Sequence, residues 1–334
     1  MGTVMNGDKW IGACVNGNVV SGLAKNGVVF YKKTTSNYLL LEYTDTSDIE
    51  HTVQFEVYND LKNFVSQNRT TLKACKLSSV GNLNATSIAQ LFYNCTNLQS
   101  VDLSNFDTSD VVNMTGLFLN CYSLETLNLN NFDTSNVTNM SDFFMGCRTL
   151  TTLNLSNFDT SNVTSMYRMF DGCYNLTNLT LGNFNTSKVI NMGIMFGSCS
   201  SLTALNLTNF NTSNVTNMGN MFSSCSDLIS LNVDNFDTSN VSRISGMFSY
   251  CSSLTVLDVS SFSIPNVNDV SAMFNGCSNL TNLNLSNMDF TQITSSTNIL
   301  RNVPTDCLIT VKNQSAKEWV LNVRNDLTNV VIAE

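Results

Sequence analysis

Eight of the eleven cysteines recur at a fixed interval of 26 residues, and thiols at regular spacing could bind a metal ion or carry out redox chemistry. Zinc needs four ligands that converge on one point, whereas one thiol per repeat places the sulfur atoms in a line. We therefore expect buried, reduced cysteines with a structural role, no metal site and no cofactor. The eight are Cys95, Cys121, Cys147, Cys173, Cys199, Cys225, Cys251 and Cys277.

A second candidate is a column of aspartates at the same spacing, Asp107, Asp133 and Asp159. Aligned carboxylates can bind Ca²⁺ through their oxygens. The alternative is a helix cap or an Asx turn, because Asn185 and Asn211 occupy the same position in later repeats. The sequence leaves both interpretations open.

Catalytic motifs are missing from the sequence. His51 is the only histidine, and the chain contains no G-x-S-x-G, H-E-x-x-H or G-x-x-x-x-G-K-[ST] pattern. We therefore predict a protein that is not an enzyme.

The most informative variable position follows the repeated cysteine. Most repeats have Ser or Thr there, but three consecutive repeats have Tyr122, Arg148 and Tyr174, and Tyr167 and Arg168 lie in the same region. Two rings that flank a guanidinium would form an exposed strip of residue types enriched in recognition hot spots. We predict a ligand-binding site at these five residues, and the alternative is a solvent-exposed face on which such residues vary freely.

The elements that position these residues follow from the rest of the repeat. Leucines three, six and eight residues after each cysteine predict a short strand, as in Leu127 and Leu129. A phenylalanine eleven residues after the cysteine is expected to pack in the core, and a polar Asp-Thr-Ser turn follows it. Val137, Met140, Phe143 and Phe144 then have helical spacing, which predicts one to two turns of helix with a capped start.

Because one such unit cannot bury its apolar face alone, the repeats must stack. We predict a right-handed α/β solenoid of the leucine-rich-repeat kind, with about nine 26-residue coils over residues 68–302. Residues 34–67 form an N-terminal cap with strands in YLLLEY and HTVQFEVY and a helix over 59–66. Residues 303–334 form a C-terminal cap with strands in CLITV and NVVIA, and a capping box of Ser315 and Glu318 opens its helix.

The composition of the chain limits the classes of partner that the protein could bind. A net charge of −9 and a pI near 4.5 argue against nucleic acid as a ligand. The N-terminal residues have neither a basic nor an apolar segment of a signal peptide, and no apolar run is long enough to span a membrane. These features predict synthesis in a cytoplasm and no membrane insertion.

The pattern F-x-x-C-x-x-L-x-x-L-x-L, seen in residues 118–129 and 170–181, resembles the leucine-rich repeats of BspA-like bacterial surface proteins. The fuller form with N-F-D-T-S-N-V-T-N-M resembles the 26-residue repeat of mycoplasma and Firmicute surface lipoproteins. The resemblance covers about residues 68–300. It departs from the common leucine-rich pattern by placing Phe where an inward Asn is usual.

Residues 1–33 differ in kind, because Asn-Gly pairs at 6–7, 16–17 and 26–27 between apolar runs predict a small β-meander. The segment WIGACVNGNVVSGLAKNGVVFYKK resembles the attachment modules of phage tail-tip and fibre proteins. This resemblance implies a phage virion component, made in the bacterial host cytoplasm. Residues 1–33 would dock to virion structural proteins, and the solenoid would bind a host-surface glycan or protein. A homo-oligomer is one form that such a component could take. The alternative is a BspA-like adhesin at a bacterial cell surface that binds host protein.

Overall fold

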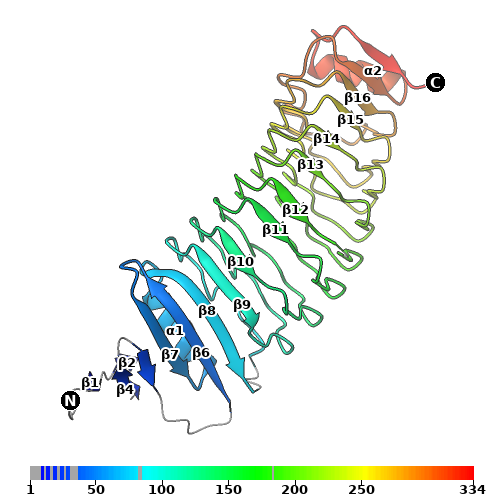
Figure 1. The fold of residues 1–334 in the computed structure, drawn as a ribbon. Coiled ribbons are helices and arrows are strands. Elements are labelled where there is room, and N and C mark those ends of the chain that lie inside the picture. Colours follow the sequence, from blue (N-terminus) through cyan, green and yellow to red (C-terminus); the bar gives the residue numbers. More distant parts are fainter. Residues whose placement is uncertain are drawn as a thin grey trace.

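The computed structural model describes residues 37–81, 85–182 and 184–334, together with the backbone of five short strands between residues 9 and 30. These residues form an elongated, gently curved solenoid (Figure 1). The predicted leucine-rich-repeat solenoid with 26-residue coils is therefore confirmed. The helices predicted within each coil are wrong, as shown below.

Five short strands precede the solenoid: β1 (Lys9–Trp10), β2 (Ala13–Val15), β3 (Asn18–Val20), β4 (Leu23–Lys25) and β5 (Val28–Phe30). β2 pairs with β3, and β4 pairs with both β1 and β5, always antiparallel. The Asn-Gly turns predicted in this segment lie outside the described residues.

The N-terminal end of the solenoid contains β6 (Tyr38–Asp45), β7 (Glu50–Phe55), α1 (Tyr58–Gln67) and β8 (Leu72–Val80). The order of this sheet is β10-β9-β8-β6-β7, in which β6 is antiparallel to both neighbours and β8 begins the parallel pairing. Leu61 and Val65 of α1 are fully buried against it. The strands and the helix expected in this segment are therefore present.

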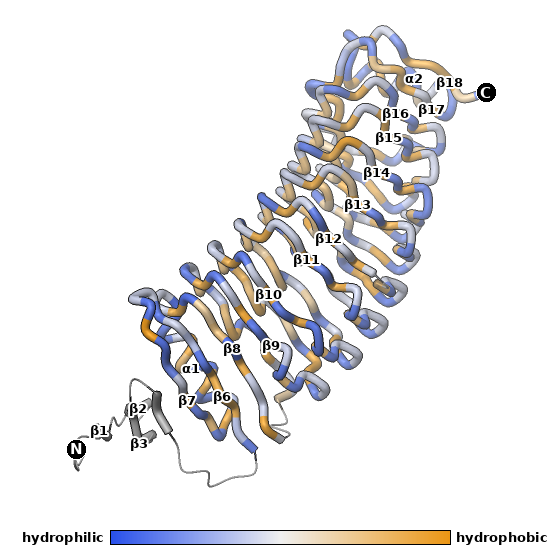
Figure 2. The backbone as a smooth tube through the Cα atoms, viewed as in Figure 1, coloured by the Kyte–Doolittle hydropathy of each residue, from blue (hydrophilic) through white to orange (hydrophobic). Residues whose placement is uncertain are grey.

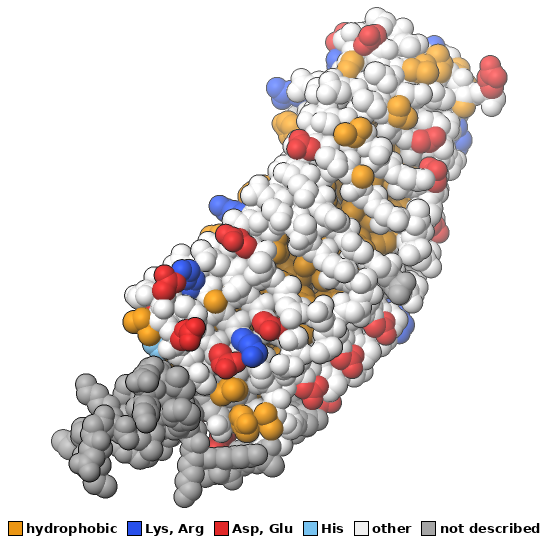
Figure 3. Space-filling view, viewed as in Figure 1, with side chains coloured by type: hydrophobic (Ala, Val, Ile, Leu, Met, Phe, Trp, Pro, Cys, Tyr) orange, Lys and Arg blue, Asp and Glu red, His pale blue; other side chains and the backbone are white. Residues whose placement is uncertain are grey.

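Each coil contributes one strand to a parallel wall, here called the strand wall. The strands are β9 (Ser100–Asn105), β10 (Thr126–Asn128), β11 (Thr152–Asn154), β12 (Asn178–Thr180), β13 (Ala204–Leu205), β14 (Ser230–Leu231), β15 (Val256–Asp258) and β16 (Asn282–Leu285). Where they pair, partners are 26 residues apart, as in Leu127 opposite Val101. The sheet is interrupted between β10 and β11, between β12 and β13, and between β14 and β15. Figure 3 shows hydrophobic side chains along the middle of the visible face, and Leu127, Leu179 and Leu205 are only partly buried.

The C-terminal end closes with β17 (Leu308–Val311), α2 (Gln314–Val323) and β18 (Val330–Ile332), which continue the parallel sheet after β16. The predicted capping box is wrong. Asn313 is the N-cap residue, and its side-chain oxygen accepts the N–H of Ala316 at 3.0 Å. Asparagine is as good an N-cap as serine, so the helix begins one position before the predicted box.

The wall opposite the strands consists of consecutive turns, and we call it the turn wall. Within the described residues, helices occur only as α1 and α2 at the two ends. In each coil the residues five and one before the repeated cysteine have positive φ, between 54° and 77°. Asn120 and Gly146 are examples, and such a residue at the third position of a turn defines a type II geometry. A helix cannot form across residues that alternate in this way.

Backbone hydrogen bonds in the turn wall connect successive coils rather than staying within one coil. At the second junction, for example, the N–H groups of Met114, Gly116, Phe118 and Asn120 donate to carbonyls 25 residues further on, at 2.7–3.1 Å. The same four bonds recur at most junctions. The turn wall is therefore continuous where the strand wall is interrupted.

The core repeats coil by coil, and apolar residues alternate with polar ones along the backbone (Figure 2). Eight phenylalanines stack from Phe92 to Phe274, with centroids of neighbouring rings 5.5–5.9 Å apart and planes within 10°. The predicted buried cysteines are confirmed as free thiols. From Cys121 onward, each repeated thiol donates to the carbonyl of the phenylalanine 29 residues earlier, at 3.1–3.3 Å.

A threonine in each Asp-Thr-Ser or Asn-Thr-Ser turn is the main buried polar group. Thr108, Thr134, Thr160, Thr186, Thr212 and Thr238 are at most 2% exposed. Each hydroxyl donates to a backbone carbonyl of the next coil, at 2.6–3.0 Å. A buried hydroxyl needs such a partner, so these bonds hold neighbouring coils in register.

Candidate functional site

Three residues of the predicted strip come together across three coils. The guanidinium carbon of Arg148 lies 4.2 Å from the ring centroid of Tyr122 and 5.7 Å from that of Tyr174. Both distances are within the range of cation–π contacts. We call this group the Tyr–Arg–Tyr stack. Arg148 is exposed, and Tyr174 is 42% exposed.

The two tyrosine rings of the stack lie against glycines of the turn wall. A Cβ atom on Gly146 would lie 3.5 Å from the Tyr122 ring, and one on Gly172 would lie 4.0 Å from the Tyr174 ring. Both glycines have φ near +75°, a conformation that glycine adopts without steric cost. The flat backbone at these positions therefore supports the two rings.

Thr149 joins the first two coils of the stack. Its hydroxyl group lies 3.1 Å from the carbonyl oxygen of Tyr122 and 2.8 Å from that of Leu124. This contact bridges the interruption of the strand wall between β10 and β11. The spacing of Tyr122 and Arg148 is therefore fixed even though no strand pairing holds them.

Arg148 carries a positive charge without an acidic neighbour. No salt bridge within 4.0 Å, and no hydrogen bond of its guanidinium, links it to any residue of the described ranges. The two rings contact the guanidinium group, and its N–H groups are its polar surface. This arrangement suits an acceptor that approaches edge-on.

The other two predicted residues form a separate group. Arg168 lies 5.9 Å from the ring of Tyr167, and its Nε is 3.0 Å from Asp171 and 3.9 Å from Asp142. The charge of Arg168 is therefore balanced by two carboxylates. Sequence position placed all five residues in one region, but only the structure shows that one arginine is neutralised and the other is not.

The two carboxylates around Arg168 are partly buried. Burial raises the pKa of Asp142 and of Asp171 above the ordinary value, and the Arg168 charge opposes that shift. One carboxylate oxygen of Asp142 is buried without a hydrogen-bond partner. These features describe an arginine held between two partly buried carboxylates, and the charge of Asp171 also raises the pKa of Asp142.

The aspartate column has local structural partners. Oδ1 of Asp133 accepts both the N–H and the hydroxyl of Ser135, at 2.9 and 2.7 Å, and Asp107 does the same with Ser109. Asn211 makes the equivalent pair of bonds to Ser213. The Asx turn is therefore the observed role of the position, and no group of three or more metal-binding side chains occurs among the described residues.

The outward-facing asparagine side chains of the strand wall share one orientation. The side-chain oxygens of Asn128, Asn154, Asn206, Asn232 and Asn284 each accept the N–H two residues further along, at 2.8–3.3 Å. The amide nitrogens therefore point away from these turns. The amide nitrogen of Asn284 donates to Asp258 at 3.2 Å, and the side chain of Asn128 bonds Asp102. The strand wall thus presents the amide nitrogens of Asn154, Asn206 and Asn232 together with hydroxyl groups.

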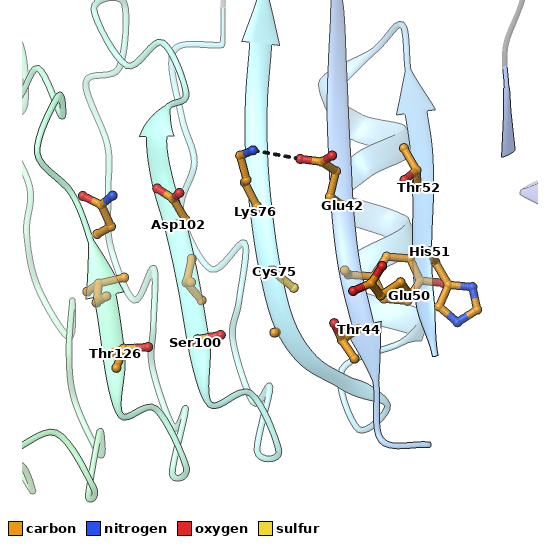
Figure 4. Close-up of a pocket in the computed structure, with 15 residues that line it drawn as sticks. Glu42, Thr44, Glu50, His51, Thr52, Cys75, Lys76, Ser100, Asp102 and Thr126 are labelled. Carbon is orange, nitrogen blue, oxygen red and sulfur yellow. Dashed lines mark ion pairs between the residues drawn. The ribbon is translucent and has the colours of Figure 1, made fainter. Parts of the chain in front are cut away.

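A shallow groove of about 520 Å³ lies at the N-terminal end of the strand wall, across β7, β6, β8, β9 and β10. Figure 4 shows Glu42, Lys76 and Asp102 in one row of this groove, with Glu42 and Lys76 joined as an ion pair at 3.1 Å. Ala74 lines the groove in the neighbouring row, between Thr44 and Ser100. No sequence pattern indicated this groove, because it depends on how the antiparallel strands of the cap pair.

The residues that build the stack were only partly visible in the sequence. The three aromatic and basic residues stood out from the Ser and Thr of other coils, but Gly146, Gly172 and Thr149 did not enter the prediction. A signal was present, since glycine directly before the repeated cysteine occurs in only some coils. It could be interpreted only once the left-handed conformation of that position was known.

These features define a repeat scaffold of the leucine-rich-repeat class, with variable side chains displayed on a rigid stack of coils. The chain belongs to the family described as "Mycoplasma protein of unknown function, DUF285", whose sequence pattern matches residues 86–205 and 194–319. This match confirms the predicted resemblance to the BspA-like and mycoplasma-type repeats.

Among solved structures, the chain is similar to a leucine-rich-repeat protein of T. pallidum, with 19% identity and a TM-score of 0.34. That similarity covers 55% of this chain and 83% of the other. A search of curated proteins gave no match. Among the described residues, neither helix has the length and apolar character that a membrane crossing requires.

Proposed function

We propose that this protein is a non-enzymatic recognition protein displayed at a bacterial cell surface, where the solenoid binds a host-surface glycan or protein. The observation that carries the proposal is the Tyr–Arg–Tyr stack. An exposed tyrosine, a partly exposed tyrosine and an unpaired, exposed arginine lie together on the stacked coils, and these residue types dominate binding energy at interfaces.

The scaffold supports this role. Coils joined by turn-wall bonds and by buried threonines hold side chains of different coils at fixed distances. Binding to such a surface costs little conformational entropy, because its side chains are already ordered. No arrangement in the described residues joins a nucleophile to a base.

Membership of a family described for Mycoplasma proteins favours the cell-surface adhesin over the phage virion component. The virion interpretation depends on residues 1–33, whose turns lie outside the described residues. It stays an alternative, together with the predicted docking of that segment to virion structural proteins.

The test is binding of the purified protein to an array of host-surface glycans and extracellular proteins. Intact protein should bind a defined subset of spots, and a variant with Tyr122, Arg148 and Tyr174 all changed to Ala should lose at least tenfold in affinity. A matched control changes Ser226, Ser252 and Ser278, the equivalent positions of three later coils, to Ala. Loss of binding in the control alone, or no binding by intact protein, would overturn the proposal.

A further inference from the structure

We infer that the Tyr–Arg–Tyr stack recognises an acidic glycan, through a carboxylate or sulfate group that accepts hydrogen bonds from Arg148 while a sugar ring packs on a tyrosine. This inference rests on the proposed function and specifies its ligand. It is argued from the donors of the stack, from the space beside it and from the charge of the whole chain.

The donors of the stack favour an oxyanion. The guanidinium is planar, stays charged at all relevant pH values and presents its N–H groups as a fork that matches a carboxylate or sulfate. The guanidinium carbon lies 4.2 Å from the Tyr122 ring and 5.7 Å from the Tyr174 ring, so both rings restrict where the group can lie before any ligand arrives. Because no carboxylate of the described chain occupies the fork, the ligand must supply the acceptor.

The space beside the stack favours a sugar as the carrier of the oxyanion. The equivalent positions in the flanking coils are the small residues Thr96 and Ser200, and the hydroxyl of Ser200 bonds back to the carbonyl of Tyr174 at 3.1 Å. The face of the Tyr174 ring that points away from Arg148 therefore has no large neighbour at the next position. An exposed aromatic face of this kind suits the apolar C–H face of a sugar ring.

The strand wall adds donors for the hydroxyl groups of further sugars. The amide nitrogens of Asn154, Asn206 and Asn232 point away from the turns that use their oxygens. Together with the uncovered face of the Tyr174 ring, these amide donors favour a glycan over an acidic peptide, and the peptide probe below tests that choice.

The net charge of the protein limits how many acidic groups a ligand can carry and still bind. A chain with a net charge of −9 repels a polyanion, and Arg148 is a single charge in this region. We therefore expect a mostly neutral glycan that carries an isolated acidic sugar, rather than a densely sulfated polymer.

The experiment measures affinity of the full chain for four probes by biolayer interferometry at 50 and 300 mM NaCl. The probes are a sialic-acid-terminated trisaccharide, its neutral disaccharide core, the same disaccharide with one sulfate, and an Asp-rich decapeptide. We expect the two acidic sugars to bind at least tenfold more tightly than the neutral core and the peptide. Their binding should weaken at the higher salt concentration.

Two substitutions distinguish the effect of the planar guanidinium of Arg148 from the effect of its positive charge. Arg148→Lys keeps the charge and loses the planar fork, so the preference for acidic sugars should fall about tenfold. Arg243→Lys, at an exposed arginine on the turn wall, is the matched control and should leave it unchanged. Equal binding of the neutral core and the acidic sugars, or tighter binding of the peptide, would overturn the inference. Either result would leave the proposed recognition function standing, whereas binding of no array component would remove both.

Discussion

The repeated cysteine combines two roles that few other side chains could fill at this position. It occupies a site with at most 1% exposure in the eight repeated coils, and from Cys121 onward its thiol donates to a phenylalanine carbonyl of the preceding coil. Alanine would leave a gap and remove one of the two hydrogen bonds that the phenylalanine carbonyl accepts. A larger apolar residue would displace the stacked rings, because the core is closely packed.

Burial also keeps these thiols protonated. Removal from water raises the pKa of Cys173 to about 12, because the thiolate loses its solvation. A thiol with a pKa this high is a poor nucleophile at neutral pH. The cysteines are therefore chemically inert while the protein is folded.

The first prediction concerns stability at alkaline pH. In the unfolded chain the thiol of Cys173 ionises near pH 9, whereas in the folded protein it stays protonated, so rising pH favours unfolding. At pH 8, Cys173→Ala should lower the free energy of unfolding by roughly 1–2 kcal/mol, because it leaves a small cavity. Between pH 8 and pH 10.5 that difference should change by roughly 2 kcal/mol, so that it vanishes or reverses sign.

Urea titrations of both proteins at the two pH values measure this difference. Lysines and tyrosines titrate in both proteins alike, so their effects cancel in the comparison. A difference that stays constant with pH would mean that the thiol ionises equally in the folded state, contrary to its burial.

At the scale of the element, the turn wall replaces the helices that the apolar spacing predicts. Val137, Met140, Phe143 and Cys147 follow one another at intervals of three or four residues, and both a helix and a series of three-residue turns satisfy that spacing. The deciding information is the backbone conformation five and one residues before the cysteine. Gly and Asn are frequent there, and both tolerate positive φ, but other coils have Arg168, Ile194 or Tyr250.

The second prediction uses one of these strained positions. Ile194 has φ of +57°, a conformation that costs a β-branched residue about 1–2 kcal/mol relative to glycine. Ile194→Gly should therefore raise the free energy of unfolding by about 1 kcal/mol, seen as an increase in Tm by circular dichroism. This gain is unusual for a substitution to glycine.

Ile190→Gly is the control, because Ile190 is half exposed and has an ordinary negative φ. It should lose about 0.5–1 kcal/mol from the greater freedom of glycine in the unfolded chain. If both substitutions destabilise equally, the positive φ at 194 carries no strain.

At the scale of the whole molecule, the 26-residue period could be predicted from sequence because every interaction between coils depends on it. The ring stack, the thiol contacts and the threonine bonds all repeat at this interval, so equal spacing of like residues predicts which side chains become neighbours. This is why the contact of Tyr122, Arg148 and Tyr174 could be anticipated. The groove beside Lys76 could not, because it lies where the repeat ends and antiparallel strands begin.

The third prediction concerns the deletion of one 26-residue repeat. Deletion of residues 187–212 joins Thr186 to Ser213 and preserves the register of every ladder. The shortened chain should fold, with an unchanged far-UV spectrum and a Tm only a few degrees lower, because each coil contacts only its neighbours.

Deletion of residues 187–210 removes two residues fewer and serves as the comparison. It displaces the core positions at the junction, so the buried thiols there should react with a thiol reagent without denaturant. Equal thiol protection in the two deletions would mean that coil length is not set by the register of the core.

The unequal walls give the rod a preferred direction of flexing. Turn-wall bonds run from coil to coil along the solenoid, whereas strand pairing stops at three places along the opposite side. A force that bends the solenoid would first separate the coils at the three interruptions of the strand wall. The continuous turn wall would act as the hinge. Bending would then be accommodated by small elastic openings at those interruptions rather than by loss of a whole coil.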